Sequence, residues 1–61
     1  MKLKCLALLN KAWKSGDSLV VKIYDSTAYY DIAYITLDIA IDVYGDCKVK
    51  EFDGNNVSIW E

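Results

Sequence analysis

Apolar and polar residues alternate most regularly over residues 18–24, S-L-V-V-K-I-Y. Leu19, Val21 and Ile23 take every second position, and most residues of the segment are typical of strands. A period of two places these three side chains on one face of a strand and Lys22 on the other. The pattern therefore predicts a β-strand over residues 18–24 with one apolar face.

Residues 26–45 form the longest apolar stretch, and both regular periods fit it. As a strand, every second residue from 35 to 43 is Ile, Leu or Val. As a helix, with about 100° per residue, the stretch separates into three lines. These are an aspartate line (Asp31, Asp38, Asp42), an aliphatic line (Ile32, Ile35, Ile39, Val43) and a tyrosine line (Tyr30, Tyr34, Leu37, Ile41, Tyr44).

Three features favour the helix for this central stretch. The alternation is broken at residues 34 and 35, and no Gly, Pro or Asn between residues 26 and 44 could turn a hairpin. The triplet Asp-Ser-Thr at residues 25–27 offers N-caps, and Gly45 is placed as a left-handed residue that ends a helix. We predict the helix. The alternative is one long strand over residues 29–44, in a meander of four strands.

The remaining segments complete an α-β-α-β-β order. Leu6, Leu9 and Trp13 recur at helical spacing, which predicts a first helix over residues 2–14. Residues 47–52 and 57–60 are predicted strands, joined at D-G-N-N by a hairpin turn. The expected fold class is α+β, as a single domain over residues 1–61. It has a small three-stranded sheet with two helices packed on one face.

Composition indicates a domain that needs help to stay folded. A chain this short buries only about 60% of the surface that its unfolded form exposes, whereas 54% of its residues are hydrophobic. We therefore expect self-association or a protein partner. No charge-free apolar run is long enough to span a membrane. The basic, apolar N-terminus mimics a signal peptide but is too short for one, so a cytoplasmic location is expected.

Charge is divided unevenly along the chain. Residues 1–16 hold four lysines and no acid, a charge of +4. Residues 17–61 hold nine acids and three lysines, a charge of −6, so the total is −2. This division predicts a basic N-terminal element on an acidic body. Its lysines could meet phosphates, although a solvated face is the preferred interpretation.

Residues for catalysis or metal binding are scarce. The chain has no histidine and no arginine, and its two cysteines, Cys5 and Cys47, do not form a C-x-x-C motif. We expect two reduced thiols, with a disulfide between them as the alternative. No nucleophile has an evident base, and no Gly-rich phosphate loop is present. The sequence therefore predicts a protein that is not an enzyme and has no cofactor.

Two acidic features have a structural and a functional interpretation. The aspartate line could bind a divalent cation, or could imitate nucleic-acid phosphates together with Asp46. Yet Asp31 and Asp38 lie two helical turns apart, so a solvated edge is preferred. D-G-N-N at residues 53–56 lacks the further ligands of an EF-hand loop and is interpreted as a turn.

The tyrosine line is the best candidate for a binding surface. A helix in a two-layer domain needs one apolar flank, and the aliphatic line supplies it. The first helix either covers the second flank or leaves it exposed to a partner. The predicted partner-binding residues are Tyr30, Tyr34, Leu37, Asp38, Ile41, Asp42 and Tyr44.

These observations predict a small, non-enzymatic protein-interaction protein. Very small acidic proteins without an active site are common among phage and mobile-element inhibitors, including anti-CRISPRs. The expected mode of action is to bind and block a host protein complex in the cytoplasm. One alternative is a homodimeric structural or regulatory module. The other, less favoured, is a weak nucleic-acid binder.

Overall fold

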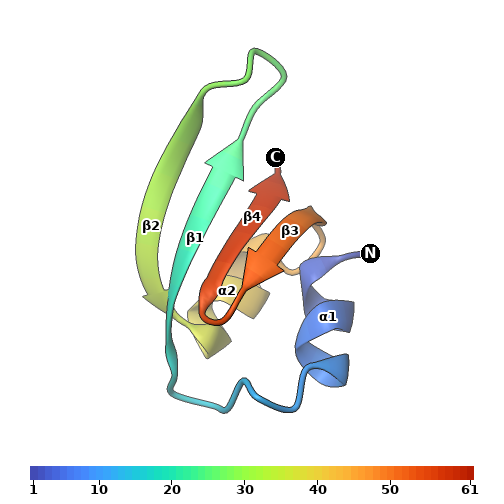
Figure 1. The fold of residues 1–61 in the computed structure, drawn as a ribbon, viewed down its shortest axis with the longest axis vertical. Helices are drawn as coiled ribbons and strands as arrows, with labels where there is room; N and C mark the ends of the chain where they lie inside the picture. The colour runs from blue at the N-terminus through green and yellow to red at the C-terminus, as the bar shows by residue number, and fades with distance from the viewer.

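The protein folds in the order α-β-β-α-β-β. The computed structural model describes all of residues 1–61. Its elements are α1 (Leu3–Leu9), β1 (Ser18–Tyr24), β2 (Tyr30–Thr36), α2 (Leu37–Tyr44), β3 (Lys48–Asp53) and β4 (Asn56–Trp60). The four strands form one sheet in the order β2-β1-β4-β3 (Figure 1).

The sheet is mixed, with its two central strands parallel. β1 pairs antiparallel with β2 and parallel with β4, and β3 pairs antiparallel with β4. The β3–β4 register shifts between Val49 and Glu51, which leaves Lys50 as a bulge. The parallel pair needs a long crossover, and β2, α2 and β3 provide it.

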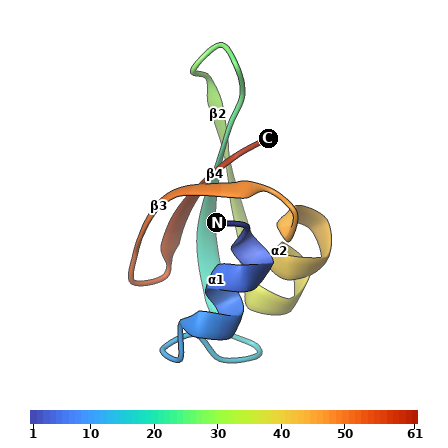
Figure 2. The same cartoon turned by 90° about the vertical axis from the view of Figure 1, so that its right-hand side faces the viewer.

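Both helices lie on the same side of the sheet and enclose the core (Figures 1 and 2). The alternate residues of β1, Leu19, Val21 and Ile23, face the helices, as the sequence pattern predicted. The buried apolar residues form one cluster: Leu3, Leu6, Trp13, Leu19, Val21, Ile23, Leu37, Ala40, Val57 and Ile59. The α+β class and the helices on one face are therefore confirmed, but the sheet has four strands rather than three.

The single helix predicted for the central stretch is wrong, and so is the single long strand. The chain is a strand over β2, continues directly into α2, and turns back from β1 around residues 25–29. No Gly was needed for that turn, because Ala28 itself adopts a positive φ of 68°. Asp25 stabilises the turn: its Oδ1 accepts hydrogen bonds from the backbone N–H and hydroxyl of Thr27. The regular alternation over residues 35–43 therefore falls mostly on α2, whereas the strand forms over residues 30–36, where the alternation is broken.

The predicted ends of that helix are corrected accordingly. Its N-cap is Thr36, which makes no side-chain cap hydrogen bond, and not a residue of the 25–27 triplet. Gly45 has φ −57° and ψ −30°, so it is right-handed. Gly45 is buried, and a Cβ there would collide with the carbonyl oxygen of Ile41. Close approach, rather than a left-handed turn, explains the glycine.

The first helix is shorter than predicted. α1 ends at Leu9, and the side chain of Asn10 accepts a hydrogen bond from the Ala12 N–H, which favours a turn there. Leu6 and Trp13 are buried as expected, whereas Leu9 is exposed. Leu3, fully buried, takes the place in the core that the helical pattern assigned to Leu9.

The C-terminal hairpin was predicted correctly within a residue at its strand ends. β3 and β4 are joined through Gly54, which has a φ of 58°, and Asn55. The turn also contacts β1: the Val20 N–H donates to the Asn55 carbonyl, and the Asn55 amide donates to the Ser18 carbonyl. The Trp13 indole N–H donates to the Gly54 carbonyl at 2.8 Å.

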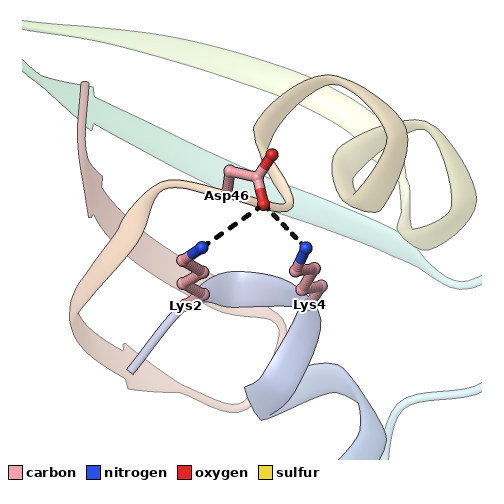
Figure 3. Close-up of polar contacts among 3 residues, drawn as sticks. All are labelled: Lys2, Lys4 and Asp46. Carbon is pink, nitrogen blue, oxygen red and sulfur yellow. Dashed lines mark ion pairs between the residues drawn. The ribbon is translucent and has the colours of Figure 1, made fainter.

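The chain's first residues cover the beginning of the outer edge of β3. The Leu3 N–H donates to the Cys47 carbonyl, and the Val49 N–H donates to the Met1 carbonyl. The backbones of Lys2 and Lys48 thereby form an isolated antiparallel β-bridge. Ion pairs reinforce this contact, because Asp46 Oδ1 lies 2.8 Å from Lys4 Nζ and 3.7 Å from Lys2 Nζ (Figure 3).

These ion pairs predict a pH dependence of stability. The hydrogen bond and charge of Lys4, with the charge of Lys2, hold the pKa of Asp46 below its ordinary 3.8. A depressed carboxyl pKa stabilises the fold above the unfolded-state pKa, and this contribution disappears as pH falls through the native pKa. The Asp46→Asn variant should therefore lose less stability than the wild type on acidification below about pH 4.

Urea unfolding along a pH series measures this difference in the free energy of unfolding. The effect is expected to be small, because all three side chains are exposed and water screens them. Asp42→Asn is the matched control, because Asp42 is exposed and forms no ion pair. Identical acid-dependent losses in both variants would show that the Asp46 pairs do not stabilise the fold.

Candidate functional site

The side of the sheet opposite the helices carries most of the exposed aromatic residues. In Figure 1, β1 and β4 pass in front of α2, and no helix lies in front of the sheet. We call this surface the open face. Its residues are Val20, Lys22, Tyr24, Tyr30, Ile32, Tyr34, Lys50, Ser58 and Trp60.

The alternation of β1 and the pairing register assemble this face. Since Leu19, Val21 and Ile23 face the core, the side chains between them project to the open face. Directly opposite residues of paired strands share a face. Tyr24 is opposite Tyr30 on β2 and Trp60 on β4, so three aromatic rings from three strands meet there.

The rings form a contiguous aromatic cluster. The Tyr24 and Tyr30 ring centroids are 4.9 Å apart with planes at 36°, and Tyr24 and Trp60 are 5.8 Å apart. Tyr34 continues the row along β2 with 77% of its surface exposed, and Ile32 lies between Tyr34 and Tyr30 in the same row. Aromatic residues left exposed in a row are characteristic of binding surfaces.

Two lysines lie among these rings. Lys22 Nζ is 5.5 Å from the Tyr30 ring centroid, and Lys50 Nζ is 5.0 Å from that of Tyr24 and 5.9 Å from that of Trp60. Neither lysine forms a salt bridge. The bulge in β3 gives Lys50 this position. The aromatic cluster is therefore positively charged on a protein of net charge −2.

A shallow hollow of about 310 Å³ adjoins the cluster at the β3–β4 turn. Its polar groups are Lys22, Glu51, Asp53, Asn56 and Ser58. The two carboxylates are exposed and have no histidine or other base beside them, and Ser58 has no activating partner. The hollow can hydrogen-bond a ligand, but it offers no nucleophile–base pair.

A second hollow of about 310 Å³ lies between the helices and is mainly apolar. It is lined by Lys4, Cys5, Ala7, Leu8, Leu37 and Ile41. Leu8 is 83% exposed at its rim. This groove is separate from the open face, because the helices lie on the other side of the sheet.

The seven predicted partner-binding residues do not share one surface. Tyr30 and Tyr34 lie on the open face. Leu37 is buried, and Ile41 and Tyr44 are half-buried against the core. Asp38 and Asp42 are exposed on α2, where Asp38 Oδ2 accepts a hydrogen bond from the Ser15 hydroxyl at 2.9 Å. Since β2 ends at Thr36, the tyrosine line is divided between a strand and a helix.

Sequence reasoning missed the other half of the open face, namely Tyr24, Trp60, Lys22 and Lys50. A signal for two of them was present, because the alternation of β1 placed Lys22 and Tyr24 away from the core. Trp60 and Lys50 had no such signal. Their positions depend on the parallel pairing of β4 with β1 and on the bulge in β3.

The rest of the molecule has scattered metal-ligating groups, two free thiols and two short helices. No three His, Cys, Asp or Glu residues lie close enough to hold a metal ion. Cys5 and Cys47 are free thiols, and burial raises the pKa of the Cys47 thiol. No helix is long and apolar enough to cross a membrane.

No protein-family model matches the chain, and no curated protein or solved structure is significantly similar to it.

Proposed function

We propose that the protein is a non-enzymatic binding protein that covers a surface on a larger protein through its open face. The observation that carries this proposal is the aromatic cluster in which the exposed rings of Tyr30 and Trp60 pack on the half-buried Tyr24, extended by the exposed Tyr34. Tyr and Trp provide large contact areas with little loss of conformational freedom, and they dominate binding energy at protein interfaces.

The position of the cluster supports this mode of action. Its rings lie on paired strands of a sheet, so the backbone beneath them is fixed and little ordering is required on binding. Lys22 and Lys50 would select a partner surface that offers carboxylates beside apolar groups. In this proposal a phage or mobile element encodes the protein and uses it to inhibit a host complex, as its size and class suggest.

A comparison of two variants tests the proposal. Trp60→Ser should abolish retention of the partner on the immobilised protein, since it removes the exposed ring that packs against Tyr24 in the cluster. Leu8→Ser, on the helix side, should leave retention unchanged. Quantitative mass spectrometry of proteins captured from the source cell measures both. A protein retained equally by the wild type and both variants would contradict the open face as the contact surface.

A second candidate function is binding of single-stranded nucleic acid on the same face. The observation that favours it is the pairing of lysines with exposed rings, since bases stack on aromatic side chains and lysines contact phosphates. It ranks second because Glu51 and Asp53 adjoin the cluster and the net charge is −2. Fluorescence anisotropy with labelled oligothymidine should then show binding that weakens with salt.

A further inference from the structure

The two edge strands of the sheet, β2 and β3, differ in whether other parts of the chain cover them. Residues 1–3 cover the beginning of the outer edge of β3, at residues 47–49, and a bulge at Lys50 interrupts the strand after that point. The outer edge of β2 has neither feature: its register with β1 is regular over all seven residues. No other strand pairs with it, so β2 is the free edge of the sheet.

The register identifies the unpaired backbone groups. Just outside the β1–β2 ladder, the Asp25 N–H donates to the Tyr29 carbonyl, and the Leu37 N–H donates to the Asp17 carbonyl. Hydrogen-bonded pairs alternate in an antiparallel ladder, so the odd-numbered residues of β2 bond to β1. The N–H and C=O groups that point outward therefore belong to Tyr30, Ile32, Tyr34 and Thr36.

β2 also lacks the residues by which proteins protect an edge. Its sequence, Y-D-I-A-Y-I-T, contains no Pro, Gly or Lys, and Asp31 is its single charge. Long, flat, apolar edges of this kind pair with another strand. An additional strand would hydrogen-bond to the outward groups and pack against the side chains of Ile32 and Tyr34.

The neighbouring helix α2 has an exposed aliphatic flank behind the sheet. Leu37 and Ile41 face α1 and line the groove between the helices. At about 100° per residue, Ile39 and Val43 lie on the side of α2 turned away from that groove. Both are exposed, at 50% and 59%. Since α2 packs against β1 and β2 while α1 packs against β3, this flank is on the β2 side of the molecule.

We propose that two copies of the chain pair antiparallel through their β2 edges, giving a two-fold symmetric dimer with one continuous sheet. An axis at Ala33 places all seven residues of both strands in register. Ile32 then lies opposite Tyr34 of the second copy, a favourable β-branched–aromatic pair on the open face. Asp31 lies opposite Ile35 of the second copy, so the two carboxylates do not oppose each other.

The occupant is argued to be a second copy from the sequence of β2 itself. The strand is complementary to itself in this register, because each Ile32 meets a Tyr34 and each Asp31 meets an Ile35 of the other copy. Growth by the same contact stops at two, because the two-fold axis uses the β2 edge of both copies, and the β3 edge is covered at residues 47–49 and interrupted by the bulge at Lys50. The dimer would join two open faces into one wider aromatic surface, although the proposed function does not require it.

Oligomeric mass and one edge variant test the dimer. Light scattering and sedimentation equilibrium from low micromolar to millimolar concentration should show reversible monomer–dimer exchange. Ile32→Pro removes an outward N–H and leaves the β1 ladder intact. It should raise the dissociation constant about tenfold or more, since one donor is lost from each copy. Tyr34→Lys protects the edge independently, and Trp60→Lys is the matched control on the open face.

Hydrogen exchange gives the second readout. In the dimer the amides of Ile32 and Tyr34 should be protected at high concentration and exchange fast on dilution. Those of Asp31 and Ala33, bonded to β1, should stay protected at both concentrations. A monomer at millimolar concentration, or a dimer that keeps its affinity in both Ile32→Pro and Tyr34→Lys while circular dichroism shows them folded, would overturn the proposal. If Trp60→Ser loses the protein partner but still forms the dimer, the dimer contact and the proposed binding function use different surfaces.

Discussion

Replacing Trp13 by alanine is expected to unfold much of the protein at room temperature. Trp13 is 95% buried although it lies outside α1, in the loop that leads to β1. Its ring packs edge-on against Phe52 at 5.9 Å, and its N–H bonds to the Gly54 carbonyl. It therefore joins the N-terminal segment to the β3–β4 hairpin.

The free energy of unfolding is expected to fall by about 3–5 kcal/mol, as it does when other large core residues are replaced by alanine. A domain of this length has a total stability of about 3–9 kcal/mol, so the change removes most of it. Urea unfolding followed by far-UV circular dichroism measures the loss. Trp13→Phe is the matched variant: it retains a packed ring, loses one hydrogen bond, and should cost about 1 kcal/mol from that bond. Equal stability of Trp13→Ala and the wild type would contradict the role of this residue in the core.

The second large effect is expected at Gly45, where a valine should cost about 1–3 kcal/mol through overpacking. The backbone of Gly45 is right-handed, so the cost does not come from φ. It comes from the side chain itself, because a Cβ would collide with the Ile41 carbonyl oxygen and already lie in contact with Lys4 of α1, which leaves no room for the further methyl groups of valine. The chain between α2 and β3 would have to move away from α1.

Asparagine distinguishes this explanation from the one that the sequence favoured. A left-handed cap tolerates Asn almost as well as Gly. A site that has no room for any Cβ does not tolerate Asn, so Gly45→Asn should be as destabilising as Gly45→Ala. Thermal unfolding of the three variants measures the difference. Gly54, with a φ of 58° and open space around it, is the control at which Asn should be tolerated. A stable Gly45→Asn protein would restore the left-handed interpretation.

The two surfaces proposed here have different physical origins. The open face exists because this chain has two short helices, and both pack on the other side of the sheet. Its aromatic rings are then exposed by default. The free edge exists because the first residues cover the beginning of β3 and no segment covers β2. Because Trp60 lies on the face but away from the edge, variants can test the two surfaces independently.

Some elements could be predicted from local sequence alone. Residues 18–24 have one regular period, and burial of Leu19, Val21 and Ile23 required no knowledge of their partners. The hairpin at residues 53–56 has turn residues that act through their own backbone preferences. The prediction that the seven candidate binding residues share one surface was wrong. It assumed that the whole central stretch is one helix, whereas the stretch is a strand followed by a helix.

The central stretch shows why sequence could not decide the rest. Its Ile, Leu, Val and Tyr residues fit a strand and a helix alike, and intrinsic preferences differ by less than about 1 kcal/mol per residue. The decision came from pairing. β1 needs a neighbour for its exposed hydrogen-bonding groups, and residues 30–36 follow it closely enough to provide one. Residues 37–44 lie beyond the end of β1 and bury Leu37 and Ala40 as a helix instead.

Sequence by itself therefore determined the α+β class, the apolar face of β1 and the C-terminal hairpin. Only the tertiary structure decided where the helix begins, which tyrosines share a surface, and that Trp60 and Lys50 join them. Local patterns fix which side of an element is apolar, because that depends on the period of one segment. Long-range pairing fixes which elements meet, because it depends on hydrogen bonds and burial that no single segment contains.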